Sequence, residues 1–305
     1  MKLLVTGAAR WSDEQLETLE KLGNEIVFVQ DERVSLVEQG IEPYDVEGVV
    51  CNGLFLYNDI DAFLKLKFVQ LTSAGYDRVP MDYISTHNIS IFNASGVYSI
   101  PMAEFAVCGV LDLYKQMNFF RHNQSFCKWE KHRGLTELYG KKVCIVGCGS
   151  VGGECAKRFS AFGCDVIGVD VAEHDVDGFD SVFKPSELKN VLPISDIVIL
   201  CLPLSDETRH LFDEDMFAKV KCGAVLVNIS RGAVVDTEAM IDALENKRLS
   251  GAVLDVFEEE PLKSDSKLWG LENVIITPHN AFVGENNNDR LFKVVSKNIK
   301  SFLEK

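Results

Sequence analysis

The stretch VCIVGCGSVG, residues 143–152, decides the fold. Four apolar residues typical of a buried strand run directly into glycines at 147, 149 and 152, and helix-type sequence continues to Gly163. The next apolar run, residues 165–170, ends on Asp170. A strand, this glycine spacing, a helix and an acid at the end of the following strand together indicate a dinucleotide-binding βαβ unit.

Each part of the glycine-rich turn has a physical task. Gly147 permits the tight turn, Gly149 lets the backbone approach a pyrophosphate, and Gly152 lets the helix pack closely on the strand. Ser150 and Val151 open the helix, where N–H groups and the helix dipole favour a phosphate. These five residues form the predicted phosphate-binding part of a coenzyme site. The alternative is a glycine-rich turn that binds no ligand.

Asp170 sets the predicted choice of coenzyme. Its carboxylate is placed to accept hydrogen bonds from the ribose hydroxyls of the adenosine half. It would repel a 2′-phosphate, and no Lys or Arg stands at 171–173 to receive one. The sequence therefore predicts NAD rather than NADP.

Two series of strands indicate two α/β domains. Helix-like stretches separate the members of each series, the pattern of parallel βαβ units. The first series comprises residues 2–6, 25–29, 48–51, 68–71 and 89–92. The second comprises residues 143–146, 165–170, 196–202, 224–229, 251–255 and 274–277. One long helix is expected over 101–120, between the two series, and an amphipathic helix over 289–305.

Composition narrows the class of protein. The chain has 305 residues, enough for two domains, and a formal net charge of −15. So acidic a surface argues against nucleic acid and anionic membranes as partners. No apolar stretch approaches the ~18 residues of a membrane span. The nine cysteines include no CxxC pair, which predicts reduced thiols in a cytoplasmic protein, and no ligand spacing predicts a metal.

Three polar segments each follow a predicted strand of the second series. Arg231 follows the run ending at 229, Glu260 follows the run ending at 255, and His279 follows the run ending at 277. Ligands of doubly wound sheets bind beyond the carboxyl ends of the strands, so these side chains are expected to face the dinucleotide. Glu258, Glu259 and the histidines outside this motif (87, 122, 132, 174 and 210) are expected to be solvated surface residues.

The chain resembles the D-isomer-specific 2-hydroxyacid dehydrogenase family over essentially its whole length. The resemblance rests on ordered motifs at residues 73–77, 93–96, 103–104, 147–152, 201–204, 228–232, 255–261 and 277–279. It implies a Rossmann-type doubly wound parallel sheet that binds NAD, with a second, smaller flavodoxin-like α/β substrate domain. The implied boundaries are 99–281 for the NAD-binding domain, and 1–98 plus 282–305 for the substrate domain.

The resemblance also implies catalytic roles. Arg231 matches the arginine that holds the substrate carboxylate and its 2-oxygen, and His279 matches the general acid/base. Glu260 matches the carboxylate that pairs with this histidine and so favours its charged form. The chemistry needs these types, because reducing a 2-oxo acid requires a proton donor and a permanent cation for the carboxylate.

Further site residues follow from the same resemblance. Ser73, Ala74 and Gly75 match the loop that binds the substrate carboxylate through backbone N–H groups. The predicted coenzyme site adds residues from three loops of the second series: Leu202, Pro203, Ile229 and Asp255. Members of the family usually form dimers through the coenzyme domain, so a homodimer is expected. The helix at 101–120 and the region around Trp129 are candidates for the contact.

Substrate and competing functions remain open at this stage. The loop NGLFLY, residues 52–57, lacks the arginine of phosphoglycerate-type members, which disfavours a phosphorylated substrate. Residues 54–57 predict a neutral or apolar substituent on the 2-oxo or 2-hydroxy acid, unless some of them are core residues. The alternatives are a phosphoglycerate-, formate- or phosphite-type dehydrogenase, an NAD-sensing corepressor-like protein, and a structural dinucleotide-binding module. Formate-type members carry Gln where Glu260 stands.

Overall fold

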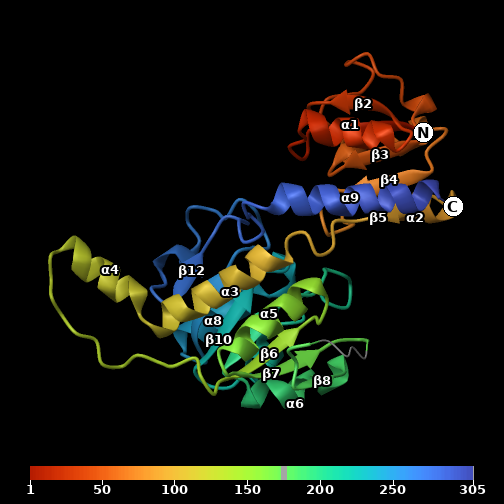
Figure 1. Cartoon of the computed structure of the whole chain (residues 1–305). Coiled ribbons are helices and arrows are strands. Elements are labelled where there is room, and N and C mark those ends of the chain that lie inside the picture. Colours follow the sequence, from red (N-terminus) through yellow and green to blue (C-terminus); the bar gives the residue numbers. More distant parts are fainter. Residues whose placement is uncertain (173–176, 305) are drawn as a thin grey trace. The chain divides into compact units, whose positions relative to one another are not determined.

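The computed structural model describes residues 1–172 and 177–304, and their chain forms two compact units (Figure 1). Unit 1 contains residues 1–98 and the described residues from Gly284 onward, and unit 2 contains Ser99–Val283. The chain thus passes between the units after residues 98 and 283, where the sequence predicts 98 and 281. Each unit has its own parallel sheet and its own core.

Unit 2 is built on a seven-stranded parallel sheet with the order β12-β11-β10-β9-β6-β7-β8. The chain starts at β6, moves outward to β8, and then returns to β9 on the other side of β6. The direction reverses between β6 and β9, which is the topological switch point where Rossmann-type sheets bind dinucleotides. The strands are β6 Lys142–Val146, β7 Asp165–Val169, β8 Ser181–Phe183, β9 Ile197–Leu200, β10 Ala224–Asn228, β11 Leu249–Leu254 and β12 Val274–Ile276.

Helices cover both faces of this sheet, which explains why its central strands are continuous apolar runs. Figure 1 shows α3 and α5 side by side on one face, where they bury Val143, Ile145 and Val227. The opposite face buries Cys144 and Leu226 against α6, α7 and α8. The helices are α3 Ser99–Tyr114, α4 Met117–Ser125, α5 Ser150–Ala161, α6 Leu188–Val191, α7 Glu214–Phe217 and α8 Thr237–Glu245.

Unit 1 carries a five-stranded parallel sheet with the order β2-β1-β3-β4-β5, the order of flavodoxin-like folds. Its strands are β1 Lys2–Thr6, β2 Glu25–Val29, β3 Gly48–Cys51, β4 Phe68–Leu71 and β5 Ser90–Phe92. Its α-helices are α1 Asp13–Lys21, α2 Met81–Thr86 and α9 Asn287–Leu303. A capping box formed by Ser12 and Gln15 opens α1, as the sequence predicts. The predicted α/β class is confirmed in both units.

Short 3-10 helices complete the connections. They span Pro43–Asp45, Leu54–Leu56, Ile60–Ala62, Pro185–Glu187, Leu192–Ile194, Gly232–Val234 and Lys267–Gly270.

Two sequence expectations about unit 2 are wrong. The helix expected over 101–120 ends at Tyr114, and Gln116 adopts a left-handed backbone conformation (φ 51°) before α4 begins. No Gly or Pro marks this break in the sequence. Strand β8 was not expected, because three half-buried residues at the edge of a sheet leave no clear pattern.

Candidate active site

The glycine-rich turn joins β6 to α5 and has no room for a side chain at Gly147 or Gly152. Gly147 has φ +97°, and a Cβ there would lie 2.8 Å from the carbonyl carbon of Cys201. A Cβ on Gly152 would lie 2.0 Å from the carbonyl oxygen of Gly147. Gly149 precedes α5, and nothing lies within 4 Å of the position its Cβ would take. The turn therefore leaves the helix N-terminus open to an approaching pyrophosphate.

Asp170 lies directly after β7 and reaches back to this turn. Its Oδ2 accepts a hydrogen bond from the Cys148 N–H at 2.6 Å, and its Oδ1 accepts one from the Ala172 N–H at 3.1 Å. These bonds fix the carboxylate beside the phosphate-binding turn, as binding of a ribose requires. Val171 and Ala172 carry no charge, and residue 173 lies outside the described residues.

Three further predicted coenzyme residues, Leu202, Pro203 and Ile229, differ in the solvent exposure of their side chains. Leu202 is buried and Pro203 is exposed, after β9. Ile229 is 1% exposed and packs in the core, so only its backbone is available to a coenzyme.

Arg231 is presented by a turn that Asn228 holds closed. Asn228 is buried; its Oδ1 accepts from the N–H and Oγ of Ser230 at 3.1 and 2.8 Å, and its Nδ2 donates to the Arg231 carbonyl at 3.1 Å. The Arg231 side chain is half-buried and donates from Nη1 to the Ser230 carbonyl at 2.8 Å. A Cβ on the next residue, Gly232, would lie 1.8 Å from the carbonyl carbon of Phe257. The loops after β10 and β11 are therefore in backbone contact beside the arginine.

Asp255 organises the segment that carries His279. It is 2% exposed at the end of β11, and its Oδ1 accepts from Thr277 Oγ1 at 2.6 Å and Asn280 N–H at 2.7 Å. Its Oδ2 accepts from the Ala281 N–H at 2.9 Å, and its carbonyl accepts from the His279 N–H at 2.8 Å. Asp255 was predicted as a coenzyme residue; these bonds give its carboxylate a structural task, since it fixes the backbone on both sides of His279.

His279 and Glu260 form a hydrogen-bonded pair. His279 Nδ1 lies 2.9 Å from Glu260 Oε2, and Glu260 Oε1 accepts from the Phe257 N–H at 3.1 Å. The His279 backbone is left-handed (φ 50°), an uncommon conformation for a residue with a side chain. The second ring nitrogen, Nε2, has no partner within the described chain. The pair thus has the arrangement of a general acid/base with its orienting carboxylate.

The three side chains stand on neighbouring strands. Arg231 follows β10, Glu260 follows β11 and His279 follows β12, in a sheet where β10 pairs with β11 and β11 with β12. The glycine-rich turn and Asp170 follow β6 and β7 of the same sheet. All five features therefore lie at the carboxyl edge of unit 2.

Glu258 is not the solvated loop charge that the sequence suggested. Its Oε1 lies 2.6 Å from His210 Nε2, and its Oε2 accepts hydrogen bonds from the N–H and hydroxyl of Thr237. Burial acts to raise the pKa of Glu258, but these hydrogen bonds outweigh it and the pKa lies below its usual value. The Glu258 carboxylate thus links its own loop after β11 to His210, in the loop after β9, and to Thr237, at the start of α8. His174 lies outside the described residues.

The Ser73–Gly75 loop of unit 1 presents backbone donors. Ser73 Oγ donates to the Gly75 carbonyl at 3.2 Å, and Asn93 Nδ2 donates to the Ala74 carbonyl at 2.7 Å. The N–H groups of Ala74 and Gly75 donate to no acceptor in the part of the chain that the structure describes. Two fixed, unpaired N–H groups suit a carboxylate.

The loop after β3 differs from its expected role. Leu54 is fully buried and Phe55 packs on Phe63 with ring centroids 5.7 Å apart, so both belong to the core of unit 1. These two residues therefore give no support to an apolar substrate side chain, whereas Leu56 and Tyr57 are 58% and 53% exposed and remain available for that predicted role. A residue that the sequence did not single out, Glu32, is buried beneath the loop and accepts from the N–H groups of Asn52 and Gly53 at 3.1 and 2.5 Å.

The described residues contain neither a metal-binding cluster nor a membrane-spanning helix. Among residues 1–172 and 177–304, no group of three or more His, Cys, Asp or Glu side chains is arranged to hold a metal ion. Within the same residues, no helix is both long and apolar enough to cross a membrane.

A family model described as D-isomer specific 2-hydroxyacid dehydrogenase, NAD binding domain, matches residues 107–281. This chain belongs to the D-isomer-specific 2-hydroxyacid dehydrogenase family. The matched range contains the glycine-rich turn, Asp170, Arg231, Glu260 and His279. The family's coenzyme is NAD, and the glycine geometry and the fixed Asp170 fit its pyrophosphate and ribose.

Curated relatives of this family member include a reductase and a dehydrogenase. A glyoxylate reductase of Thermofilum pendens is 33% identical over 252 residues, which cover 80% of this chain and 74% of that protein. An (S)-sulfolactate dehydrogenase of Chromohalobacter salexigens is 32% identical over 243 residues, which cover 79% of each. The family member is thus an oxidoreductase similar to enzymes with different acid substrates.

Two solved structures resemble this chain over nearly its whole length. The TT0316 protein of Thermus thermophilus has a TM-score of 0.79 at 27% identity, covering 100% of this chain and 97% of that one. A D-isomer specific 2-hydroxyacid dehydrogenase of Xanthobacter autotrophicus, solved with NADPH and MES, has a TM-score of 0.78 at 26% identity, covering 99% and 95%. The Rossmann-type architecture predicted from the sequence is confirmed.

Proposed function

We propose that this chain is an NAD-dependent reductase that interconverts a 2-oxo acid and a D-2-hydroxy acid. The observation that carries the proposal is the His279–Glu260 pair, 2.9 Å apart, with Nε2 left to meet a substrate. Bound NAD(H) would supply the hydride, held by the glycine-rich turn and Asp170.

His279 is proposed to move the proton. In reduction its protonated Nε2 gives a proton to the forming hydroxyl, and in oxidation the neutral ring takes that proton back. Glu260 on Nδ1 orients the ring and favours its charged form. Asp255 acts through its hydrogen bonds to Thr277, Asn280 and Ala281, which hold the histidine where the ring can do this.

Arg231 is proposed to bind the substrate carboxylate and to stabilise charge on the 2-oxygen. A guanidinium stays charged at every working pH and offers paired donors to a carboxylate. The same cation stabilises the negative charge that develops on the oxygen as the hydride arrives. In unit 1, the N–H groups of Ala74 and Gly75 are proposed as further carboxylate donors.

The test is coenzyme consumption with a panel of 2-oxo acids, running from glyoxylate and hydroxypyruvate to branched and aromatic members. The proposal expects NADH to be consumed in equal amount with the 2-oxo acid. An NAD-sensing corepressor-like protein or a structural module would bind NADH without turnover. Formation of NADH from NAD⁺ with formate or phosphite, without turnover of any 2-oxo acid, would favour those dehydrogenases instead.

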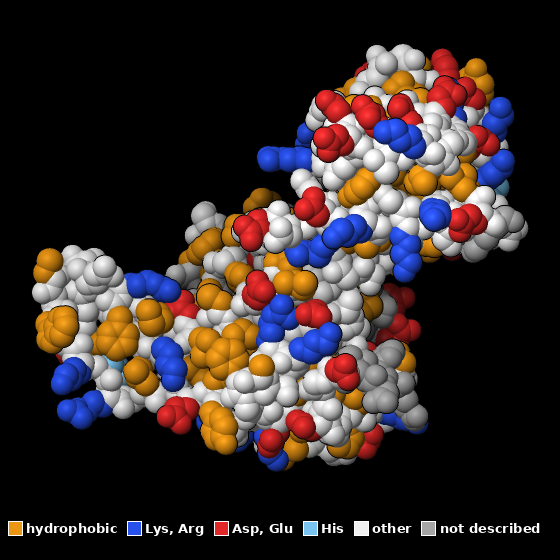
Figure 2. Space-filling model, viewed as in Figure 1, with side chains coloured by type: hydrophobic (Ala, Val, Ile, Leu, Met, Phe, Trp, Pro, Cys, Tyr) orange, Lys and Arg blue, Asp and Glu red, His pale blue; other side chains and the backbone are white. Residues whose placement is uncertain are grey.

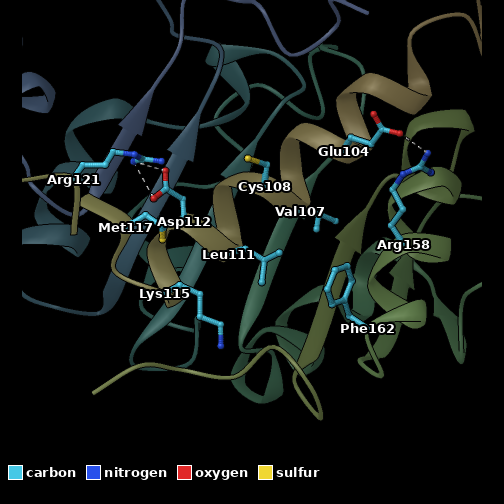
Figure 3. Close-up of a pocket in the computed structure, with 10 residues that line it drawn as sticks. All are labelled: Glu104, Val107, Cys108, Leu111, Asp112, Lys115, Met117, Arg121, Arg158 and Phe162. Carbon is cyan, nitrogen blue, oxygen red and sulfur yellow. Dashed lines mark hydrogen bonds and ion pairs between the residues drawn. The ribbon is translucent and has the colours of Figure 1, made fainter. Parts of the chain in front are cut away.

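We also propose that the chain forms a homodimer through α3, α4 and the loop after α4. Figure 3 shows a hollow on this face in which Val107, Leu111 and Phe162 form an apolar centre. Two ion pairs flank it, Arg121–Asp112 at 2.9 Å and Arg158–Glu104 at 3.2 Å. An apolar centre with a polar rim is typical of protein–protein interfaces.

The loop after α4 adds an unusual degree of exposed apolar surface. Trp129 is 98% exposed and Phe126 is 62% exposed. Figure 2 shows hydrophobic side chains gathered on this part of unit 2. Contiguous exposed apolar surface indicates a partner, and a second copy of this chain offers the same apolar face in return.

Thiol labelling with a mass measurement tests the dimer. Cys108 lines the hollow, Cys127 lies on the loop, and Cys222, on another exposed part of unit 2, is the matched control. The dimer predicts twice the chain mass by light scattering, with Cys108 and Cys127 labelled more slowly than Cys222 as concentration rises. A monomer mass at 50 μM would refute it, whereas Trp129→Ser should weaken a true dimer.

A cytoplasmic location is proposed from the thiols. All nine cysteines are free. Burial, together with the nearby Asp170, raises the pKa of the Cys148 thiol in the glycine-rich turn to about 12, so it stays protonated. Fractionation with thiol counting tests this location.

A further inference from the structure

The loops after β3 and β4 lie side by side at the carboxyl edge of unit 1. Strands β3 and β4 pair in parallel, and the Thr72 N–H donates to the Cys51 carbonyl at 2.8 Å, just beyond the last residues of the two strands. Neighbouring strands lie about 4.8 Å apart. A carboxylate bound by the loop after β4 therefore brings the next carbon atoms of its substrate within reach of residues 52–53.

Arg78 brings a positive charge to this position. Its Cδ lies 3.8 Å from the point where a Cβ on Gly53 would stand, so the glycine leaves space for the stem of the arginine. Arg78 is exposed and makes no hydrogen bond or ion pair within the described residues.

Glu32, a buried carboxylate close to Gly53, makes no ion pair with Arg78. Glu32 Oε1 lies 3.6 Å from the same point beside Gly53, but the carboxylate is already bound from other sides. Its donors are Thr6 Oγ1 at 2.7 Å and the N–H groups of Asn52 and Gly53. Glu32 thus fixes the backbone of the loop from beneath, and the guanidinium of Arg78 is exposed next to Asp77 in the loop after β4.

Asn52 adds a polar group beside the arginine. Its Oδ1 is buried and has no hydrogen-bond partner. The apolar residues that follow it, Leu54 and Phe55, turn into the core. Leu56 and Tyr57, in contrast, are 58% and 53% exposed, and Leu56 Cδ1 lies 3.6 Å from the point where a Cβ on Gly53 would stand, so this corner offers a ligand apolar groups as well as the charge of Arg78.

We propose that Arg78 determines substrate specificity by binding a second oxyanion of the substrate, at the end remote from the 2-oxo carboxylate. The group is a carboxylate, sulfonate or phosphate, which a guanidinium binds through two parallel N–H groups. The loop after β3 has no arginine of its own, and Arg78 supplies that charge from the neighbouring loop. This inference rests on the proposed function.

The test compares 2-oxo acids that differ only in the remote group. Suitable pairs are 2-oxoglutarate with 2-oxopentanoate and 3-sulfopyruvate with 2-oxobutyrate, each with NADH. The parent should favour the anionic member of a pair. Arg78→Ala should lower kcat/KM for that member by about 10- to 100-fold, the scale of a lost charge-assisted hydrogen bond, chiefly through KM. The neutral member should change less than about 3-fold.

Two variants separate charge recognition from structural damage. Arg78→Lys should recover part of the preference, because it restores the charge without the paired donors. Arg33→Ala is the matched control, since Arg33 is an exposed arginine of unit 1 whose side chain is paired with Asp31 at 2.9 Å; it should leave both members unchanged.

Each remaining outcome overturns the inference. A parent that favours the neutral member, or an Arg78→Ala variant that lowers both members equally or neither, rejects the role of Arg78 and leaves the proposed function intact. If no 2-oxo acid of the panel supports NADH consumption by the parent, the proposed function is rejected, and this inference is rejected with it.

Discussion

Replacing Glu260 with Gln removes the negative charge beside His279 while keeping the size of the side chain. In the parent, the Phe257 N–H donates to Glu260 Oε1 at 3.1 Å, and the amide oxygen of Gln can accept the same hydrogen bond. The imidazolium loses the carboxylate that lies 2.9 Å from its Nδ1. Protonated His279 is therefore less favoured in the variant, and reduction, which needs that form, should fail at a lower pH.

The size of the effect follows from the exposure of the pair. The side chains of His279 and Glu260 are 43% and 37% exposed, so water screens their attraction. Half-exposed ion pairs contribute about 0.5 to 1 kcal/mol. Since about 1.4 kcal/mol corresponds to a tenfold change, losing this attraction should lower kcat/KM for reduction at neutral pH by about 2- to 5-fold, and the alkaline limb of reduction should move to lower pH.

The assay is the pH dependence of kcat/KM for reduction, measured for the parent and Glu260→Gln with one 2-oxo acid. Oxidation of the hydroxy acid, measured in parallel, should extend to lower pH in the variant because it needs neutral His279. His279→Ala is the companion variant and should lower both directions by roughly 100- to 10,000-fold at every pH.

An alkaline limb that stays in place or moves upward in Glu260→Gln would refute the reasoning. The charge acting on His279 would then have to come from another acid. A uniform loss of rate with no shift of the profile would leave Glu260 a purely geometric role.

Three further predictions concern other parts of unit 2. Arg231→Ala should lower kcat/KM by at least ~100-fold, because it removes a carboxylate partner and a transition-state cation, while the Kd for NADH measured by fluorescence stays nearly unchanged. Asp170→Ala should lower the preference for NADH over NADPH, and a parent that uses NADPH as well as NADH would contradict the assignment. Burial acts to raise the pKa of Asp196, but hydrogen bonds from Lys221 and the Lys142 N–H outweigh burial and lower this pKa. The Asp196 carboxylate therefore stabilises the fold above about pH 4, and this stabilisation is lost as the pH falls further. Asp196→Asn should therefore lower Tm at neutral pH, and a difference that persists unchanged at pH 3 would contradict this.

The glycine-rich turn could be predicted from sequence because its requirements are local. Gly147 needs its backbone angle and Gly152 needs its missing Cβ whatever the rest of the chain does. The central strands of unit 2 could also be predicted from the sequence, because a sheet covered by helices on both faces has continuous apolar strands. Once the strands are known to be parallel, Arg231 and His279 must fall at one edge.

Features that depend on contacts between segments far apart in the chain could not be predicted from the sequence. Gln116 breaks the predicted helix without Gly or Pro, and β8 is three half-buried residues at an edge. Glu258 looks like one of three surface acids, and only its contacts with His210 and Thr237 distinguish it.

The loop after β3 shows the limit of composition most clearly. Leu54 and Phe55 resemble a substrate wall in the sequence, yet they are core residues. Glu32 and Arg78 lie 21 and 25 residues away from Gly53 along the chain, so no local pattern connects them to this loop.

Hydride transfer itself is the central claim, and deuterium labelling tests it most directly. NADH carrying deuterium at both C4 positions of the nicotinamide is incubated with the chain and the best 2-oxo acid of the panel, and the product is examined by NMR and chiral chromatography. The account predicts deuterium on C2 of a 2-hydroxy acid of D configuration, in one-to-one ratio with NADH consumed, and formation of this product at least ~100-fold more slowly with His279→Ala. A product without deuterium on C2, or NADH that is bound but never consumed, would contradict it.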